Sequence, residues 1–362
     1  MSVSNDAAFS CRIPNADPLG RSLDRTSSTR PTRGYGYWPR MIGRDLSLAQ
    51  QTFRSRFWHS VAANCVSTAW MLRCVSFQPM TSFPEAVPRW GARPDAELVR
   101  ARNNVHFSGS GPHVMMFAHG FGCDQAMWRL VAPAFEADYR VVLFDYVGCG
   151  NSDWSAWDAQ RYDSLRGYAQ DVLDVLMAFD LSDVVFVGHS VSAVIGMLAS
   201  IEAPERFSRL IHIGPSPCYL NDAGYVGGFE RSDIEGLLDL MEKNYVGWAA
   251  FLAPVVMKNP GRADLTEELQ SSFCATDPRV TRQFARVTFL SDNRADLAKV
   301  TVPSLILQCS EDAIAPDSVG RYLRGAMPGA TLRQMSATGH CPHMSHPAET
   351  VALMKEYLQQ AP

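Results

Sequence analysis

One strand–turn–helix segment constrains the fold of this chain more than any other feature. The β-branched run Val184–Val187 leads into Gly188-His189-Ser190-Val191-Ser192, and a helical pattern follows over Ala193–Ser200. A serine in so tight a turn needs small residues two positions before and two positions after it; Gly188 meets this need, and Ser192 replaces the usual glycine. Ser190 would then stand at the head of a helix, whose N–H groups favour developing negative charge. We predict that Ser190 is a nucleophile at the end of a buried strand.

Short apolar runs alternate with amphipathic stretches from about Leu98 onward. This alternation predicts a mostly parallel sheet covered by helices on both faces. The expected strands are Val114–Ala118, Val141–Phe144, Val184–Val187, Leu210–Ile213, Ser304–Gln308 and Thr331–Met335. The expected helices are Cys123–Ala132, Leu165–Phe179, Val191–Ser200, Ser318–Met327 and Pro347–Leu358.

The alternation of strands and helices is interrupted over residues 219–297 and is absent before about residue 98. These two breaks define the predicted domains. Residues 219–297 contain long helical stretches without a strand, so we expect a helical cap between two parts of a core, 98–218 and 298–362. Residues 1–60 contain nine Arg and no Lys and show little periodicity. We expect residues 1–97 to be a disordered or spurious extension outside the catalytic fold. An organelle presequence and an accessory binding segment stay open as alternatives.

Composition excludes several classes of protein. The formal net charge of −4 provides no basic surface for nucleic acid. The stretch Val61–Val75 is too short and too polar to span a membrane. The nine cysteines are scattered and odd in number. Without a secretory signal, they indicate reduced thiols in a cytoplasmic protein.

A second glycine-containing turn follows the first predicted strand, in Phe117-Ala-His-Gly-Phe-Gly122. A flexible His-Gly-x-Gly turn lets backbone amides approach a substrate closely. We predict that the N–H groups of Phe121 and Val191 form an oxyanion hole, in which each donor is worth about 10²–10³ in rate.

A serine hydroxyl needs a base, and the base needs an orienting carboxylate. His340 lies in a loop between the last strand and the C-terminal helix, and Asp312 follows the strand Ser304–Gln308. The chain order Ser190, Asp312, His340 is typical of a serine–acid–histidine triad on an α/β sheet. His189 is the alternative base, with His119, His343 and His346 behind it, and Glu311 is the alternative acid.

Two further patterns would indicate bound groups. His340, His343 and His346 recur every three residues, but Pro342 and Pro347 interrupt any regular helix through them, so we expect no metal. Gly148-Cys-Gly-Asn-Ser-Asp153 begins like a dinucleotide fingerprint but lacks its third glycine, so we expect no cofactor.

Five strings resemble the RsbQ group of α/β hydrolases, which is similar to the plant karrikin and strigolactone receptors. The resemblance covers about residues 98–360. It implies a core sheet, a V-shaped cap of four helices, the triad above and a deep apolar pocket. The strings are His119-Gly-Phe-Gly-Cys-Asp-Gln125, Phe144-Asp-Tyr-Val-Gly-Cys-Gly-Asn-Ser-Asp153, Gly188-His-Ser-Val-Ser-Ala193, Gly214-Pro-Ser-Pro-Cys-Tyr-Leu-Asn-Asp222 and Gly339-His-Cys-Pro-His-Met-Ser-His-Pro347.

These features together predict a serine hydrolase that acts on small uncharged esters or lactones. The resemblance adds an alternative: a sensor that binds or slowly cleaves a ligand and signals to a protein partner, such as a phosphatase with a PAS domain. A third alternative is C–C cleavage or perhydrolysis by the same triad. The residues expected to line the pocket are Phe121, His189, Trp248, Phe251 and Phe289.

Overall fold

The computed structural model describes residues 93–360. Most of the expected extension 1–97 therefore lies outside the described residues. Residues 93–97, the last part of this extension, are described. The Arg93 guanidinium donates a hydrogen bond to the Ala178 carbonyl at 3.0 Å. Helix α2 (Ala96–Arg102) begins where the Asp95 carboxylate accepts the N–H groups of Glu97 and Leu98. The described fold thus begins before the predicted boundary at Leu98.

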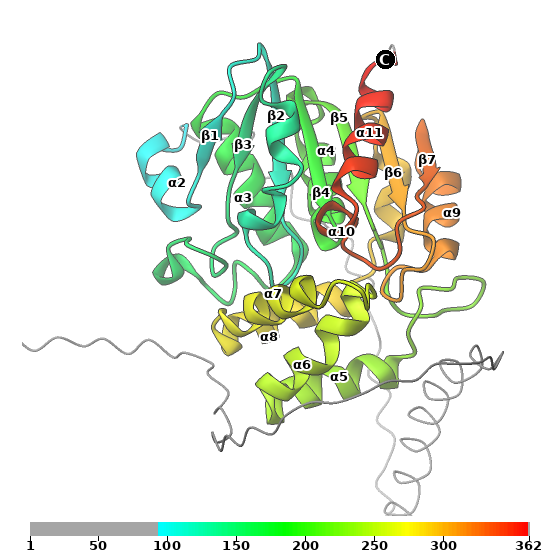
Figure 1. The fold of residues 1–362 in the computed structure, drawn as a ribbon. Helices are drawn as coiled ribbons and strands as arrows, with labels where there is room; N and C mark the ends of the chain where they lie inside the picture. Colours follow the sequence, from blue (N-terminus) through cyan, green and yellow to red (C-terminus); the bar gives the residue numbers. More distant parts are fainter. Residues whose placement is uncertain (1–92, 361–362) are drawn as a thin grey trace, which may run out of the picture. The chain divides into compact units, whose positions relative to one another are not determined.

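A seven-stranded sheet forms the centre of the fold, with strand order β1-β3-β2-β4-β5-β6-β7 (Figure 1). Only β1 is antiparallel to its neighbour; the other pairs are parallel. All six predicted strands are present, whereas β1 was not predicted because its three residues form no apolar run. The strands are β1 (His106–Ser108), β2 (His113–Ala118), β3 (Tyr139–Leu143), β4 (Val184–His189), β5 (Phe207–Ile213), β6 (Ser304–Gln308) and β7 (Ala330–Gln334).

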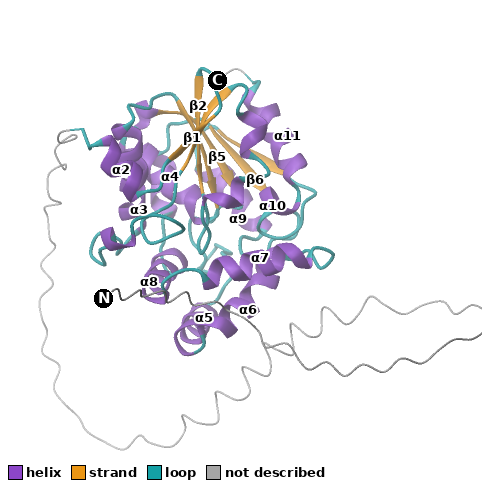
Figure 2. Cartoon of the chain, turned by 60° about the vertical axis from the view of Figure 1, so that its left-hand side comes forward, coloured by secondary structure: helices purple, strands orange, loops and turns teal. Residues whose placement is uncertain are grey.

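Helices cover both faces of this sheet, and Figure 2 shows the strands between them. Parallel strands buried on both faces carry continuous apolar runs, as β4 does over Val184–Val187 and β6 over Leu305–Leu307. The helices of the core are α3 (Leu165–Ala178), α4 (Val191–Glu202), α9 (Asp317–Ala326), α10 (Pro342–Ser345) and α11 (Pro347–Leu358). Short 3₁₀ turns link them: η3 (Trp154–Ala156), η4 (Pro204–Arg206) and η5 (Arg294–Lys299).

The prediction of one helix is wrong. Residues Cys123–Ala132 do not form an α-helix; two 3₁₀ turns, η1 (Gln125–Trp128) and η2 (Ala132–Phe135), occupy this region. Pro133 lies in the first turn of η2, where its missing N–H costs no hydrogen bond. The Asp124 carboxylate accepts the Ala126 N–H and starts the first turn.

Four helices lie between β5 and β6 in the chain and gather at one end of the sheet (Figure 1). They are α5 (Arg231–Lys243), α6 (Tyr245–Met257), α7 (Ala263–Cys274) and α8 (Pro278–Phe289). Helix α8 shows why they form: Asp277 caps it, Pro278 opens it, and Val280, Phe284 and Thr288 bury one stripe. Among residues 93–360, no helix is long and apolar enough to cross a bilayer.

Candidate active site

Ser190 occupies the strained turn between β4 and α4. Its φ of +57° and ψ of −121° lie outside the usual regions for a residue with a side chain. A Cβ on Gly188 would lie 2.5 Å from the Ser192 carbonyl oxygen, so only glycine fits two residues before the serine. The Ser190 N–H donates to the Ile213 carbonyl at 2.8 Å and anchors the turn to β5. The predicted strand–turn–helix geometry is therefore present.

The structure brings Ser190, His340 and Asp312 into one hydrogen-bonded chain. His340 Nε2 lies 2.7 Å from Ser190 Oγ, and His340 Nδ1 lies 2.7 Å from Asp312 Oδ2. All three side chains are buried. Because Nδ1–H faces a carboxylate, Nε2 carries the lone pair and is placed to accept the serine proton. This is the arrangement of a nucleophile, a base and an orienting acid.

Of the two carboxylates that the sequence left open, the structure places Asp312 beside the imidazole. Its other oxygen, Oδ1, accepts the N–H groups of Ile314 and Ala315 at 2.8 and 3.0 Å, which holds the carboxylate in place. The Glu311 side chain is 62% exposed and pairs with Lys258 Nζ at 2.7 Å. This pairing lowers the pKa of the Glu311 carboxyl at the surface, away from His340.

The His-Gly-Phe turn after β2 lies directly against the serine turn. A Cβ on Gly120 would lie 2.4 Å from His189 Nδ1 and 3.5 Å from Ser190 Cβ. Phe121 follows Gly120, and its ring lines the cavity that contains Ser190. Within residues 93–360, neither the Phe121 nor the Val191 amide donates a hydrogen bond to another group. Both amides are therefore available for a substrate oxygen.

Ser192, the departure from the usual glycine, braces the two turns. Its hydroxyl donates to the His119 carbonyl, and Tyr146 OH lies 3.0 Å from Ser192 Oγ. His119 itself accepts the Tyr146 N–H on Nε2, which leaves Nδ1–H to donate to the Gly120 carbonyl. His119 is thus a structural residue of the turn rather than a base.

A narrow, largely apolar cavity lies above Ser190 and His340. Apolar side chains form most of its wall, from the core and from helices α6, α7 and α8. Its lining residues are Phe121, Cys123, His189, Ser190, Leu252, Val256, Leu269, Phe273, Thr288, Phe289, Ile314, His340 and Cys341.

Three of the five predicted pocket residues line this cavity: Phe121, His189 and Phe289. Trp248 does not line it but is buried behind it, with its ring 6.1 Å from that of Phe121. The prediction for Phe251 is wrong, because this side chain is 56% exposed. The inward face of α6 carries residues 248, 252 and 256, and helical rotation places residue 251 outside that arc.

Tyr219 is a residue of the site that the sequence reasoning missed. It is buried, and its hydroxyl lies 3.5 Å from Ser190 Oγ. Burial raises the pKa of this phenol to about 12, so the hydroxyl keeps its proton. Tyr219 lies in the string Gly214–Asp222 that carries the family resemblance, but that string gave no chemical reason to place its phenol beside Ser190.

The C-terminal end of α6 contacts the loop that carries His340. The His340 N–H donates to the Val256 carbonyl at 2.8 Å. Asn259 Nδ2 donates to the Thr338 carbonyl at 3.0 Å, and Lys258 pairs with Glu311. The helical insertion therefore holds the base loop through hydrogen bonds that no sequence pattern indicates.

Two candidate groups of the sequence analysis have other roles. His340 contacts Ser190 and Asp312, and His346 Nδ1 lies 2.9 Å from its neighbour Ser345 Oγ. In the Gly148–Asp153 loop, the Gly148 N–H donates to Ser152 Oγ at 3.0 Å. The Asn151 N–H donates to the Asp145 carboxylate at 3.0 Å. This loop is a hydrogen-bonded support.

Comparisons with known proteins agree with this fold. The model of the alpha/beta hydrolase family matches residues 115–353. The karrikin insensitive 2 receptor CA of Petunia hybrida is 36% identical over 262 residues, covering 72% of this chain and 97% of the relative. The strigolactone esterase D14 of Arabidopsis thaliana is 39% identical over 256 residues, covering 70% of this chain and 96% of the relative.

A solved structure supports the same conclusion. The structure of a hydrolase from Oleispira antarctica is 44% identical, with a TM-score of 0.73, covering 74% of this chain and 98% of that chain. The predicted kinship with the karrikin and strigolactone receptors is confirmed, as is the predicted fold class. This chain, with its sheet, its buried serine turn and its helical insertion, belongs to the α/β hydrolase family.

Proposed function

We propose that this chain hydrolyses small uncharged carboxylic esters or lactones with Ser190 as nucleophile. The observation that carries the proposal is the pair of 2.7 Å contacts that join Ser190, His340 and Asp312 at the floor of the cavity. The esterase names of several relatives support the same reaction class.

The geometry supports acyl transfer in two steps. Ser190 Oγ attacks the substrate carbonyl carbon while its proton passes to His340 Nε2, and Asp312 stabilises the imidazolium. The free amides of Phe121 and Val191 stabilise the oxyanion. His340 returns the proton to the leaving alkoxide, and the C–O bond breaks. Water, deprotonated by the same imidazole, then releases the carboxylic acid from the serine.

The wall of the cavity supports uncharged substrates. Phe121, Phe273 and Phe289 surround the reacting atoms, and the described wall presents no Lys, Arg, Asp or Glu side chain to pair with a charged substrate. Burying an unpaired charge there would be costly.

A second candidate function is a small-molecule sensor that binds or slowly cleaves one ligand and signals to a protein partner. The identity of 36% with a protein named as a karrikin insensitive receptor favours it. The contacts between α6 and the His340 loop provide a route by which a ligand in the cavity would affect the helical insertion.

The test is the hydrolysis of a chromogenic acetate or butyrate ester by wild-type protein and by Ser190→Ala. We expect Ser190→Ala to lose at least about a thousandfold in turnover. Ser200→Ala is the matched control, because Ser200 is a buried serine of α4 that donates to the Met197 carbonyl. Retention of more than about one-tenth of the activity by Ser190→Ala would reject the nucleophile.

Intact-protein mass spectrometry after mixing with a butenolide-type lactone separates the two functions. An acyl adduct on Ser190 that disappears rapidly with turnover favours the enzyme. A lasting adduct on His340, together with a shift in melting temperature, favours the sensor.

A further inference from the structure

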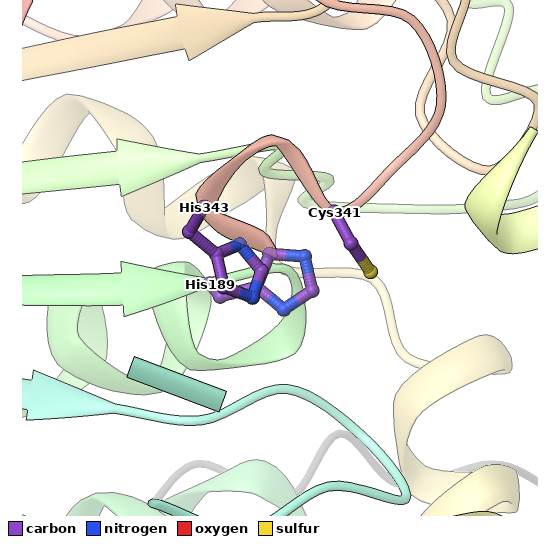
Figure 3. A group of neighbouring side chains, drawn as sticks. All are labelled: His189, Cys341 and His343. Atoms are coloured by element: carbon purple, nitrogen blue, oxygen red, sulfur yellow. The ribbon is translucent and has the colours of Figure 1, made fainter. Parts of the chain in front are cut away.

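Behind the proposed base lies a second cluster of side chains, which the hydrolytic mechanism does not use. It consists of His189 at the end of β4, and Cys341 and His343 in and beside α10 (Figure 3). One ligand atom from each lies within 4.8 Å of the others. All three residues are buried, and the two imidazole rings lie 4.4 Å apart between centroids.

The imidazole nitrogens of this cluster carry unused lone pairs. His189 Nε2 donates to the His340 carbonyl at 2.9 Å, so the hydrogen is on Nε2 and Nδ1 is bare. Within the described chain, His189 Nδ1 and both ring nitrogens of His343 have no hydrogen-bond partner. Both rings are buried, which favours the neutral imidazole, the form that binds metals.

We propose that His189, Cys341 and His343 bind one Zn²⁺ ion through two imidazole nitrogens and a thiolate. Nitrogen and sulfur donors suit zinc, whereas Mg²⁺ and Ca²⁺ require oxygen ligands. Ligand atoms on a tetrahedral zinc are about 3.4–3.6 Å apart, from bonds of about 2.0–2.3 Å. The observed limit of 4.8 Å therefore closes with side-chain shifts of about 1 Å. We predicted no metal from the sequence because we considered a different set of possible ligands: His340, His343 and His346.

The site can balance part of the charge of the ion, and the cavity gives the ion a route to it. On binding, the Cys341 thiol releases its proton to solvent as the Zn–S bond forms, and nothing is oxidised or reduced. The Cys341 thiolate offsets one of the two positive charges of zinc. His189 and Cys341 also line the cavity, which provides an entry route and leaves a fourth ligand position open.

Zinc in this site would inhibit the hydrolysis proposed above, and this part of the inference rests on that proposed function. His340 precedes Cys341 in the chain, and its carbonyl accepts the hydrogen bond from His189. An ion bound to both His189 and Cys341 draws these two residues together. It therefore displaces the loop that carries His340, the proposed base. A misplacement of about 1 Å at a reacting group costs on the order of 100-fold in rate.

Binding is tested without substrate. The full-length protein is treated with chelator, and Zn²⁺ alone is titrated in equilibrium dialysis. We expect one tightly bound ion per chain in the wild type, and an affinity lowered at least about 100-fold in Cys341→Ser and in His343→Leu. Cys123→Ser is the matched control, because Cys123 is a second buried cysteine on the cavity wall outside the cluster. We expect it to bind like the wild type.

Cobalt substitution reports the thiolate directly. Co²⁺ in the wild type and in Cys123→Ser should show a thiolate-to-cobalt charge-transfer band in the near ultraviolet, and Cys341→Ser should lack it. Circular dichroism confirms that each variant is folded, and the nearly isosteric Cys341→Ser decides the question where His343→Leu is unfolded. Wild-type protein that binds no stoichiometric zinc, or Cys341→Ser that binds it equally well, overturns the site.

Inhibition is measured separately, on ester hydrolysis by the wild type with and without one equivalent of Zn²⁺. Loss of turnover in the wild type but not in Cys341→Ser supports the inhibitory role, and unchanged turnover at full occupancy refutes it. A chain that binds zinc in dialysis but hydrolyses no ester would contradict the proposed function and leave the metal site standing.

Discussion

The substitution Asp312→Asn tests the orienting acid without changing the shape of the side chain. Asp312 Oδ1 accepts two backbone N–H groups, from Ile314 and Ala315. An asparagine at this position keeps its carbonyl oxygen on these two donors. Its NH₂ group then faces His340 Nδ1, where the wild type has a carboxylate oxygen at 2.7 Å.

The expected loss of kcat follows from the tautomer of His340 that this contact imposes. Facing a donor, His340 Nδ1 must accept, so the ring hydrogen moves to Nε2. Nε2 lies 2.7 Å from Ser190 Oγ and can then no longer take the serine proton. In an unrelated triad the same substitution lowers kcat about 10⁴-fold. At 1.36 kcal/mol per tenfold, we expect Asp312→Asn to raise the barrier by about 5 kcal/mol.

The assay compares kcat and KM for a chromogenic acetate ester, with the melting temperature as a check on folding. We expect kcat to fall and KM to change little, because no substrate contact is removed. Glu311→Gln is the matched control, since it weakens only the solvent-exposed ion pair with Lys258. A loss below about tenfold in Asp312→Asn, or a larger loss in Glu311→Gln, would refute the reasoning.

Three further predictions concern packing, the base loop and pH. Phe284 is buried and stacks on Tyr168 at 4.2 Å, so we expect Phe284→Ala to lower the free energy of unfolding by about 3–5 kcal/mol in denaturant titrations. A loss under about 1 kcal/mol would contradict this packing role. Asn259→Ala removes the hydrogen bond to the Thr338 carbonyl; we expect kcat to fall about tenfold with KM unchanged, and unaltered kcat would show that this contact does not position the base. Burial lowers the pKa of His212 to about 4 from 6.5, so the unfolded chain binds a proton that the folded chain refuses. His212 should therefore make stability fall by about 3 kcal/mol between about pH 6.5 and pH 4. His212→Leu should show a shallower fall in pH-dependent unfolding, and an identical slope would be inconsistent with a neutral buried ring.

The local features of this protein are readable from its sequence. The β-branched run before Gly188 and the helical pattern after Ser192 predicted the serine turn correctly, because a strand, a tight turn and a helix depend on neighbouring residues. The six apolar runs predicted six strands, since a strand buried on both faces carries a continuous apolar run. The chain order of Ser190, Asp312 and His340 was likewise sufficient to propose a triad.

Only the tertiary structure decided which residues from distant segments meet. Glu311 and Asp312 are adjacent in the chain, yet the amides of the following turn hold only Asp312 against His340. Phe251 lies outside the pocket because the rotation of α6 depends on how the helix packs. The buried cluster of His189, Cys341 and His343 exists because the end of β4 and α10 approach each other across about 150 residues of chain. Such contacts depend on strand order and helix packing, which residue periodicity along one segment does not specify.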